Sequence, residues 1–188
     1  AFGLDFVYSG PFAWLDFDND GDLDLLVVRT HFFQLCKRQS GAFQCVSLGT
    51  NTGGLMGKLL IQDYDQDGDL DVFAVSPTQN TLLVNQGGTF ALVDPVSVGL
   101  PKACQTAAFV DYDNDGLADF YAAPGGIYKH LPDHHFQKTD RLKYAVPQDA
   151  IAARAIWFDM DNDGSRDLLL AYSIDPEGYP FMWERALF

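Results

Sequence analysis

The sequence has little glutamate, few basic residues and no long apolar run, and each scarcity narrows what the protein can be. Of its 26 acidic residues, 24 are Asp and two are Glu, so the net charge of −14 does not reflect a generic acidic surface. The 12 Lys and Arg residues form no basic stripe that would neutralise phosphates, which argues against nucleic acid as a ligand. Because no apolar run approaches 18 residues, we expect no membrane span.

Apolar and aromatic residues are plentiful, but they occur in short runs. Hydrophobic residues make up 47% of the 188 residues and aromatic residues 14%, which is enough to bury a core. Short runs that contain aromatic and β-branched residues and lack a helical period are typical of buried strands. We therefore expect an ordered all-β protein.

Four copies of one acidic pattern, D-x-D-x-D-G-x-x-D, divide the chain. The copies start 47, 48 and 48 residues apart and occupy residues 16–24, 63–71, 111–119 and 159–167. An apolar run precedes each copy and another follows it. Sixteen of the 24 Asp lie at the four equivalent positions of these loops, so the acidity belongs to local sites.

Two further strand-like segments complete each repeat. Third strands are expected at 32–37, 81–85, 126–130 and 180–184, and a fourth strand is marked by Phe43, Phe90 or Phe136 in the first three repeats. Four strands in about 47 residues is the size of a propeller blade. We predict one β-propeller domain over residues 1–188, with four four-stranded blades at about 8–50, 55–97, 104–142 and 151–188.

The fourth repeat ends without a fourth strand of its own. Residues 1–7 have the pattern of such a strand, with Phe2 at the marker position. We predict that this N-terminal strand completes the last blade and closes a ring. The alternative is that the strand inserts into a neighbouring molecule and links subunits into a filament.

The acids of each loop have the spacing of a calcium site. Ca²⁺ takes six to eight oxygen ligands, and alternating Asp residues direct short carboxylates to one centre. We expect side chains at loop positions 1, 3, 5 and 9 and the carbonyl at position 7 to bind one ion in each repeat, four in all. The predicted ligands are Asp16, Asp18, Asp20, Asp22 and Asp24; Asp63, Asp65, Asp67, Asp69 and Asp71; Asp111, Asp113, Asp115, Leu117 and Asp119; and Asp159, Asp161, Asp163, Ser165 and Asp167.

Two other interpretations of the loops are weaker. An EF-hand needs flanking helices and a Glu at position 12, where this chain has Val27, Ala74, Ala122 and Leu170. Acidic turns without a metal would leave four carboxylates repelling one another in each loop.

The loops and their flanking strands resemble the FG-GAP repeats, also called VCBS repeats, of extracellular propeller proteins and of the head of integrin α chains. The resemblance extends over essentially the whole chain. It implies a calcium loop between the first and second strands of each blade, ions with a structural role, and a secreted or cell-surface location.

Two of the three cysteines are expected to face each other. A two-residue turn at Ser40 and Gly41 places Cys36 opposite Cys45 at a non-hydrogen-bonded position, close enough for a disulfide. We predict this bridge because calcium loops suggest an oxidising compartment; two reduced buried cysteines are the alternative. Cys104 is expected to be a small buried apolar residue.

Histidines crowd the turn of the third repeat. His130, His134 and His135 lie near Asp133, so a zinc site can be imagined there. We expect a solvated hairpin tip instead.

Three function classes remain, and the leading one is a non-enzymatic extracellular calcium-binding module for adhesion, assembly or structural support, with a protein or glycan partner. A lectin is the second, but the loops at 29–33, 76–80, 122–126 and 172–179 do not match each other as a repeated sugar pocket would. A calcium-assisted polysaccharide-degrading enzyme is the third. The chain has no Ser-His-Asp signature, histidine-zinc motif or phosphate loop, so we predict no enzymatic activity.

Overall fold

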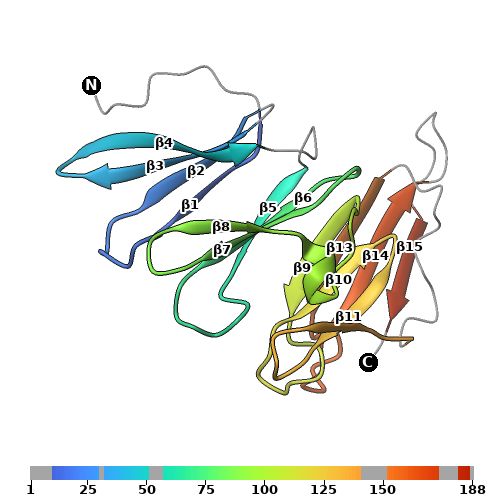
Figure 1. Ribbon diagram of the computed structural model, residues 1–188. Helices are drawn as coiled ribbons and strands as arrows, with labels where there is room; N and C mark the ends of the chain where they lie inside the picture. The colour runs from blue at the N-terminus through green and yellow to red at the C-terminus, as the bar shows by residue number, and fades with distance from the viewer. Residues whose placement is uncertain (1–9, 30–31, 51–56, 141–151, 174–181, 187–188) are drawn as a thin grey trace. The chain divides into compact units, whose positions relative to one another are not determined.

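The chain consists of antiparallel sheets arranged in two compact units. The computed structural model describes residues 10–29, 32–50, 57–140, 152–173 and 182–186. The units are Ala1–Pro95 and Val96–Phe188, and each contains two sheets (Figure 1). In the described part of the chain, no helix is long and apolar enough to cross a membrane.

The first unit holds two four-stranded sheets whose strands are ordered as in the sequence. The strands of the first sheet are β1 (Phe12–Leu15), β2 (Asp24–Val28), β3 (Phe32–Gln39) and β4 (Ala42–Thr50). Those of the second sheet are β5 (Lys58–Gln62), β6 (Asp71–Val75), β7 (Thr81–Asn85) and β8 (Phe90–Val93). A short 3-10 helix, η1 (Pro95–Val98), follows β8.

The second unit repeats this plan. The strands of the third sheet are β9 (Thr106–Val110), β10 (Asp119–Ala123), β11 (Gly126–His130) and β12 (Phe136–Lys138). The described strands of the fourth sheet are β13 (Ala152–Phe158), β14 (Asp167–Ser173) and β15 (Met182–Ala186). The second strand of the first three sheets, β2, β6 or β10, is buried at every residue, as expected of a central strand with both faces covered.

The predicted all-β class and the strand plan of the repeats are confirmed. Each acidic loop joins the first strand of a sheet to the second, and Phe43, Phe90 and Phe136 all lie on fourth strands. The predicted strand at residues 1–7 lies outside the described residues, so its pairing with the last sheet stays a prediction. Closure of the ring, the count of four blades and a single domain over residues 1–188 also stay predictions.

Each sheet has two faces, because successive side chains of a strand point to opposite sides. We call the leading face the one that carries the residue after the last Asp of the loop, which is Leu25 in the first sheet. The trailing face carries the next residue, Leu26. The equivalent pairs are Val72 and Phe73, Phe120 and Tyr121, and Leu168 and Leu169.

In the first unit, the trailing face of the first sheet packs against the leading face of the second. The shared buried cluster contains Leu15, Phe17, Leu26, Val28, Phe33 and Leu35 from the first sheet and Val72, Ala74, Leu83 and Phe90 from the second. Burying a side chain of this size contributes about 1.5–3 kcal/mol. The stacked apolar faces are therefore the main source of stability in this unit.

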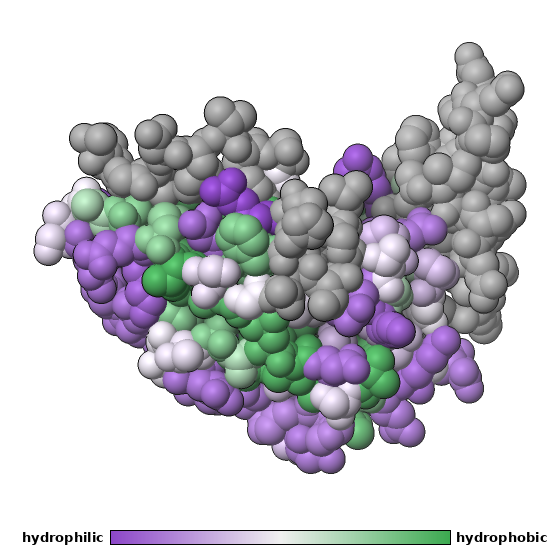
Figure 2. Space-filling view, turned by 45° about the horizontal axis from the view of Figure 1, so that its top comes forward, coloured by the Kyte–Doolittle hydropathy of each residue, from purple (hydrophilic) through white to green (hydrophobic). Residues whose placement is uncertain are grey.

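The second unit stacks its sheets by the same rule. Tyr112, Tyr121, Ala123 and Ile127 come from the trailing face of the third sheet, while Leu168 and Leu170 come from the leading face of the fourth. Some large apolar side chains elsewhere remain at the surface, and Figure 2 shows apolar patches among hydrophilic residues on one side of the molecule.

The predicted disulfide is present. Cys36 and Cys45 face each other on β3 and β4 and are bonded, while Cys104 is a buried free thiol, as expected. Cys36 belongs to a small buried cluster with Leu25 and Val27 on the leading face of the first sheet. The bridge therefore holds together the hairpin that carries this face.

Replacing both Cys36 and Cys45 with Ala should lower the free energy of unfolding by about 2–3 kcal/mol, because the unfolded chain loses a short covalent loop. Urea denaturation of the double variant and of a Cys104→Ser control would measure the difference. Wild-type protein treated with reductant should match the double variant, and an unchanged urea midpoint in both would contradict the prediction.

Candidate metal centres

The backbone of each acidic loop makes the same tight turn. The residue at position 4 has a positive φ in every copy: 56° at Asn19, 57° at Gln66, 58° at Asn114 and 61° at Asn162. The glycine at position 6 is also left-handed, with φ between 87° at Gly21 and 94° at Gly68. A Cβ at Gly21 would meet nothing within 4 Å, so this glycine is required for its backbone angle and not for space.

The carboxylate at position 1 organises the loop from inside. Asp16 accepts hydrogen bonds from the backbone N–H groups of Asp20 (3.1 Å) and Gly21 (3.0 Å), and Asp111 and Asp159 make the same pair of bonds in their loops. The position-5 carboxylate accepts the N–H of position 7 in all four loops. Backbone N–H groups thus hold these carboxylates in place without a bound ligand.

The Asp at position 9 has a second task that the sequence did not reveal. Asp71 is 1% exposed; its Oδ2 accepts the N–H of Tyr64 at 3.0 Å and its Oδ1 accepts the N–H of Asn85 at 2.8 Å. Asp24 and Asp119 are bonded in the same way to the start of their loop and to the third strand. The last Asp therefore ties loop, second strand and third strand together.

Burial shifts the acidity of these last Asp residues. It raises the pKa of Asp71 to about 7 and that of Asp119 to about 6, although two backbone hydrogen bonds to each carboxylate oppose the shift. Nearby loop carboxylates, Asp65 and Asp67 in the case of Asp71, raise the pKa further. A cation in the loop would relieve this repulsion.

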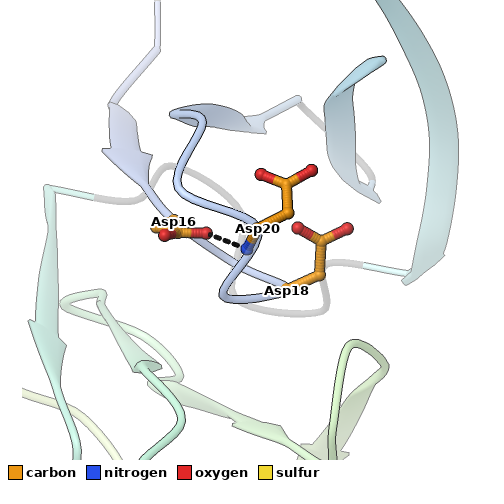
Figure 3. Close-up of side chains that lie close together, drawn as sticks. All are labelled: Asp16, Asp18 and Asp20. Atoms are coloured by element: carbon orange, nitrogen blue, oxygen red, sulfur yellow. Dashed lines mark hydrogen bonds between the residues drawn. The ribbon is translucent and has the colours of Figure 1, made fainter. Parts of the chain in front are cut away.

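The predicted ligands gather in each loop, though not in full sets. Three carboxylates in each loop have ligand oxygens within 4.8 Å of one another. The groups are Asp16, Asp18 and Asp20; Asp63, Asp65 and Asp71; Asp111, Asp113 and Asp115; and Asp159, Asp161 and Asp167. Positions 1 and 3 therefore meet in every loop, whereas the third member is position 5 in two loops and position 9 in the other two. In Figure 3, the carboxylates of Asp18 and Asp20 point the same way above the loop that Asp16 closes.

The donor set fits Ca²⁺. Two oxygens bound to one Ca²⁺ at about 2.3–2.6 Å are at most about 5 Å apart, which these groups satisfy. Asp18, Asp63 and Asp113 each have a buried Oδ1 that accepts no hydrogen bond. A buried carboxylate oxygen without a donor is costly unless a cation compensates it.

Position 7 was expected to contribute its carbonyl alone, and two of its four side chains have other partners. Asp22 forms an ion pair with Arg38 at 3.4 Å, and Asp69 accepts hydrogen bonds from the Gly87 N–H and from Asn19 Nδ2. Asp67, Asp163, Asp24 and Asp119 lie outside the three-carboxylate groups, and the ligand roles of all the predicted residues stay predictions.

Two lysines beside the loops were missed by the sequence analysis. Lys129 on β11 contacts Asp113 and lies 2.9 Å from Asp115, and Lys37 on β3 lies 3.6 Å from Asp18. These contacts raise the pKa of Lys129 and lower that of Asp115. In the second repeat the equivalent residue is Val84. The signal was available, because each lysine stands opposite the last Asp of its loop in the strand register.

The histidines of the third sheet do not gather as metal ligands. Among the described residues, the groups able to hold a metal are the four acidic loops. His130 is buried and stacks on Phe136 with ring centroids 4.5 Å apart, and burial lowers its pKa. His135 bonds to Asp133 within the exposed turn, so the expectation of a hairpin tip suits this geometry better than zinc does.

The pKa of Asp71 predicts a pH-dependent stability of the metal-free protein. The folded state binds this proton more tightly than the unfolded chain, where Asp titrates near about 4. The stabilisation is complete below about pH 4 and is lost as the pH rises through about 7. Urea denaturation in chelator should therefore show that the difference in free energy of unfolding between wild type and Asp71→Asn changes between about pH 4 and about pH 7.

The control is Asp140→Asn, which changes an exposed carboxylate. This variant should keep the pH dependence of the wild type, because Asp71 is still present. Parallel pH profiles for wild type and Asp71→Asn would show that Asp71 is not the titrating group.

Comparison with known proteins agrees with this geometry. Residues 63–122, which include the second and third acidic loops, match the family model of the FG-GAP-like repeat. No curated protein matches the sequence significantly. A solved structure of an Agrocybe aegerita lectin, described as recognising non-reducing terminal N-acetylglucosamine, is similar with a TM-score of 0.58 and 17% identity.

The alignment with that lectin covers 92% of this chain and 50% of the lectin chain, so this chain spans about half the length of its structural neighbour. At this identity the likeness concerns the fold alone, which is propeller-like. The resemblance predicted from the acidic loops is confirmed over residues 63–122, which match the FG-GAP-like repeat.

Proposed function

We propose that this chain is a non-enzymatic calcium-binding module of the β-propeller type that acts outside the cell in adhesion, assembly or structural support. The observation that carries the proposal is the gathering of three carboxylates in each of four loops with the same backbone geometry. Peptide N–H groups hold these carboxylates in place, and buried Oδ1 atoms are left without a donor.

Calcium bound in a loop would neutralise the carboxylates at positions 1, 3 and 5 or 9. Because the last Asp also accepts N–H groups from the loop and the third strand, fixing it would stiffen the loop and two strands at once. Millimolar extracellular Ca²⁺ would saturate even weak sites of this kind. The disulfide also favours an oxidising compartment. Both features support a secreted or cell-surface location.

The buried acids are poorly placed for catalysis. Asp71 has the raised pKa of a general acid, but it is 1% exposed and both its oxygens accept backbone N–H groups. A substrate would have to displace the third strand to reach it. This arrangement supports a structural role for the carboxylates.

Metal analysis after equilibrium dialysis should find four Ca²⁺ per chain. Asp113→Asn removes a carboxylate from the third loop and should reduce the count by one, whereas Asp140→Asn should leave it unchanged. Excess chelator should lower the melting temperature of the wild type by several degrees, because only the folded state binds the ions tightly. A melting temperature insensitive to both chelator and Ca²⁺ would contradict the proposal.

Lys129 should weaken calcium binding at the third loop, because its ammonium lies next to Asp115. Lys129→Met is expected to raise the calcium affinity of that loop about three- to tenfold. This factor corresponds to the Coulomb repulsion between two charges a few ångströms apart in a largely aqueous setting. Val84→Lys should lower the affinity of the second loop by a similar factor. Calorimetric titration would measure both, and an unchanged affinity in both variants would remove the lysines from this role.

Glycan binding is a second candidate, favoured by the propeller-like lectin neighbour. The calcium-loaded protein can be screened on a glycan array that includes terminal N-acetylglucosamine. Binding that is lost after competition with the free sugar would support a lectin, and no binding across the array would leave the structural module.

A further inference from the structure

The backbone of the first acidic loop is held from two sides at Phe17, its second position. Phe17 is 1% exposed and lies between Asp16 and Asp18. Its N–H donates to Asp24 Oδ2 at 3.2 Å, within its own sheet. Its carbonyl accepts a hydrogen bond at 2.7 Å from Nδ2 of Asn85, which belongs to β7 of the second sheet. The peptide that joins two candidate calcium ligands is therefore held by a residue of the next sheet.

Asn85 is in turn held by the second acidic loop. Asn85 is fully buried, and its N–H donates to Asp71 Oδ1 at 2.8 Å. Its side-chain Oδ1 accepts the N–H of Gly88 at 2.9 Å, which orients the amide so that Nδ2 faces the Phe17 carbonyl. Asp71 is one of the three carboxylates whose oxygens gather in the second loop. Hydrogen bonds thus run without a break from the second loop through Asn85 to the first.

Two further contacts join the first loop to the second sheet, and both are less buried. Asn19 Nδ2 donates to Asp69 Oδ1 at 2.7 Å between exposed side chains. Lys37, which lies 3.6 Å from Asp18, donates to a carbonyl of the β7–β8 turn at 3.3 Å. Exposed polar contacts compete with water and contribute little, whereas a buried carbonyl that loses its donor is costly. The buried hydrogen bond of Asn85 is therefore the strongest of these links.

We propose that the first and second loops bind Ca²⁺ with positive cooperativity and that Asn85 transmits the coupling. This inference rests on the proposed function, because it needs an ion in each loop. Asp71, once fixed as a ligand in the second loop, fixes the N–H of Asn85, whose side chain then fixes the Phe17 carbonyl. A first loop that is already ordered loses less conformational freedom when it binds its own ion, so it binds that ion more tightly. Repulsion between the two ions acts in the opposite direction, and salt screens it.

The glycine at loop position 6 allows each loop to be observed separately. The N–H of Gly21 donates to Asp16 Oδ2 at 3.0 Å, and the N–H of Gly68 donates to Asp63 Oδ2 at 3.1 Å. Both acceptors belong to the gathered carboxylates, so each glycine amide resonance should shift when its loop binds an ion. The full chain, labelled at glycine nitrogen and titrated with Ca²⁺ in about 0.15 M salt, gives the affinity of each loop by NMR.

Emptying one of the two loops should weaken the other. Asp65→Asn removes a carboxylate from the second loop, and Gly68 should then no longer respond at the calcium concentrations that saturate the wild type. The affinity that Gly21 reports should fall about fivefold or more. Asp18→Asn should empty the first loop and lower the affinity that Gly68 reports by the same factor, because coupling between two binding sites is reciprocal.

Asn85→Ala tests the link itself. This variant removes the side-chain donor and changes neither loop, so Asp65→Asn in this background should leave the affinity that Gly21 reports unchanged. A second variant, Asn85→Asp, keeps the size of the side chain, loses the same donor and should also abolish the coupling. The control is Gln86→Ala, which changes the exposed neighbour and should keep the full effect of Asp65→Asn. Circular dichroism checks that each variant is folded.

The outcomes separate the coupling from calcium binding itself. Gly21 and Gly68 may both respond to Ca²⁺ in the wild type while the affinity reported by Gly21 is unchanged or higher in Asp65→Asn; this result overturns the coupling and leaves the proposed function standing. A fivefold effect that persists in both Asn85 variants overturns the role of Asn85. If no position-6 glycine responds to Ca²⁺, the loops bind no ion, and the proposed function and the coupling both fail.

Discussion

The buried carboxylate at the end of each loop is the interaction on which the rest of the structure depends. Asp24, Asp71 and Asp119 each use one oxygen to hold the start of the loop and the other to hold the third strand. Hydrogen bonds to a charged acceptor are stronger than neutral ones, but the carboxylate must be buried to make them. Burial raises the pKa of Asp71 and Asp119 because it destabilises the charged carboxylate, and a neighbouring positive charge would stabilise that form.

Two kinds of positive charge are available to satisfy that need. A divalent cation would sit among the carboxylates of one loop, whereas Lys37 and Lys129 approach the first and third loops from the third strand. A lysine balances part of the charge permanently, whereas the equivalent residue of the second repeat, Val84, carries no charge. The repeats share a fold but differ in how their acidity is neutralised, so their affinities for a cation should differ.

The sequence predicted the features that depend on local pattern. Period, strand positions and the pairing of Cys36 with Cys45 follow from spacing, because alternation and a two-residue turn determine register. The second role of Asp71 could not be read in this way, since its partner Asn85 lies on another strand and contributes only a backbone N–H. The lysines were missed because their relation to the loops appears only once two strands are aligned.

The side chains of a loop point alternately to two places, the centre of the loop and the next sheet. Asp16, Asp18 and Asp20 turn toward the centre of the first loop, while Phe17 and Asn19 between them reach the next sheet. A ligand that orders the odd positions must therefore order the even ones, because one backbone carries both. Calcium binding would for that reason be coupled to the stacking of sheets through a few peptide units, and an ion in the fourth loop would also fix the position of exposed loop residues such as Met160.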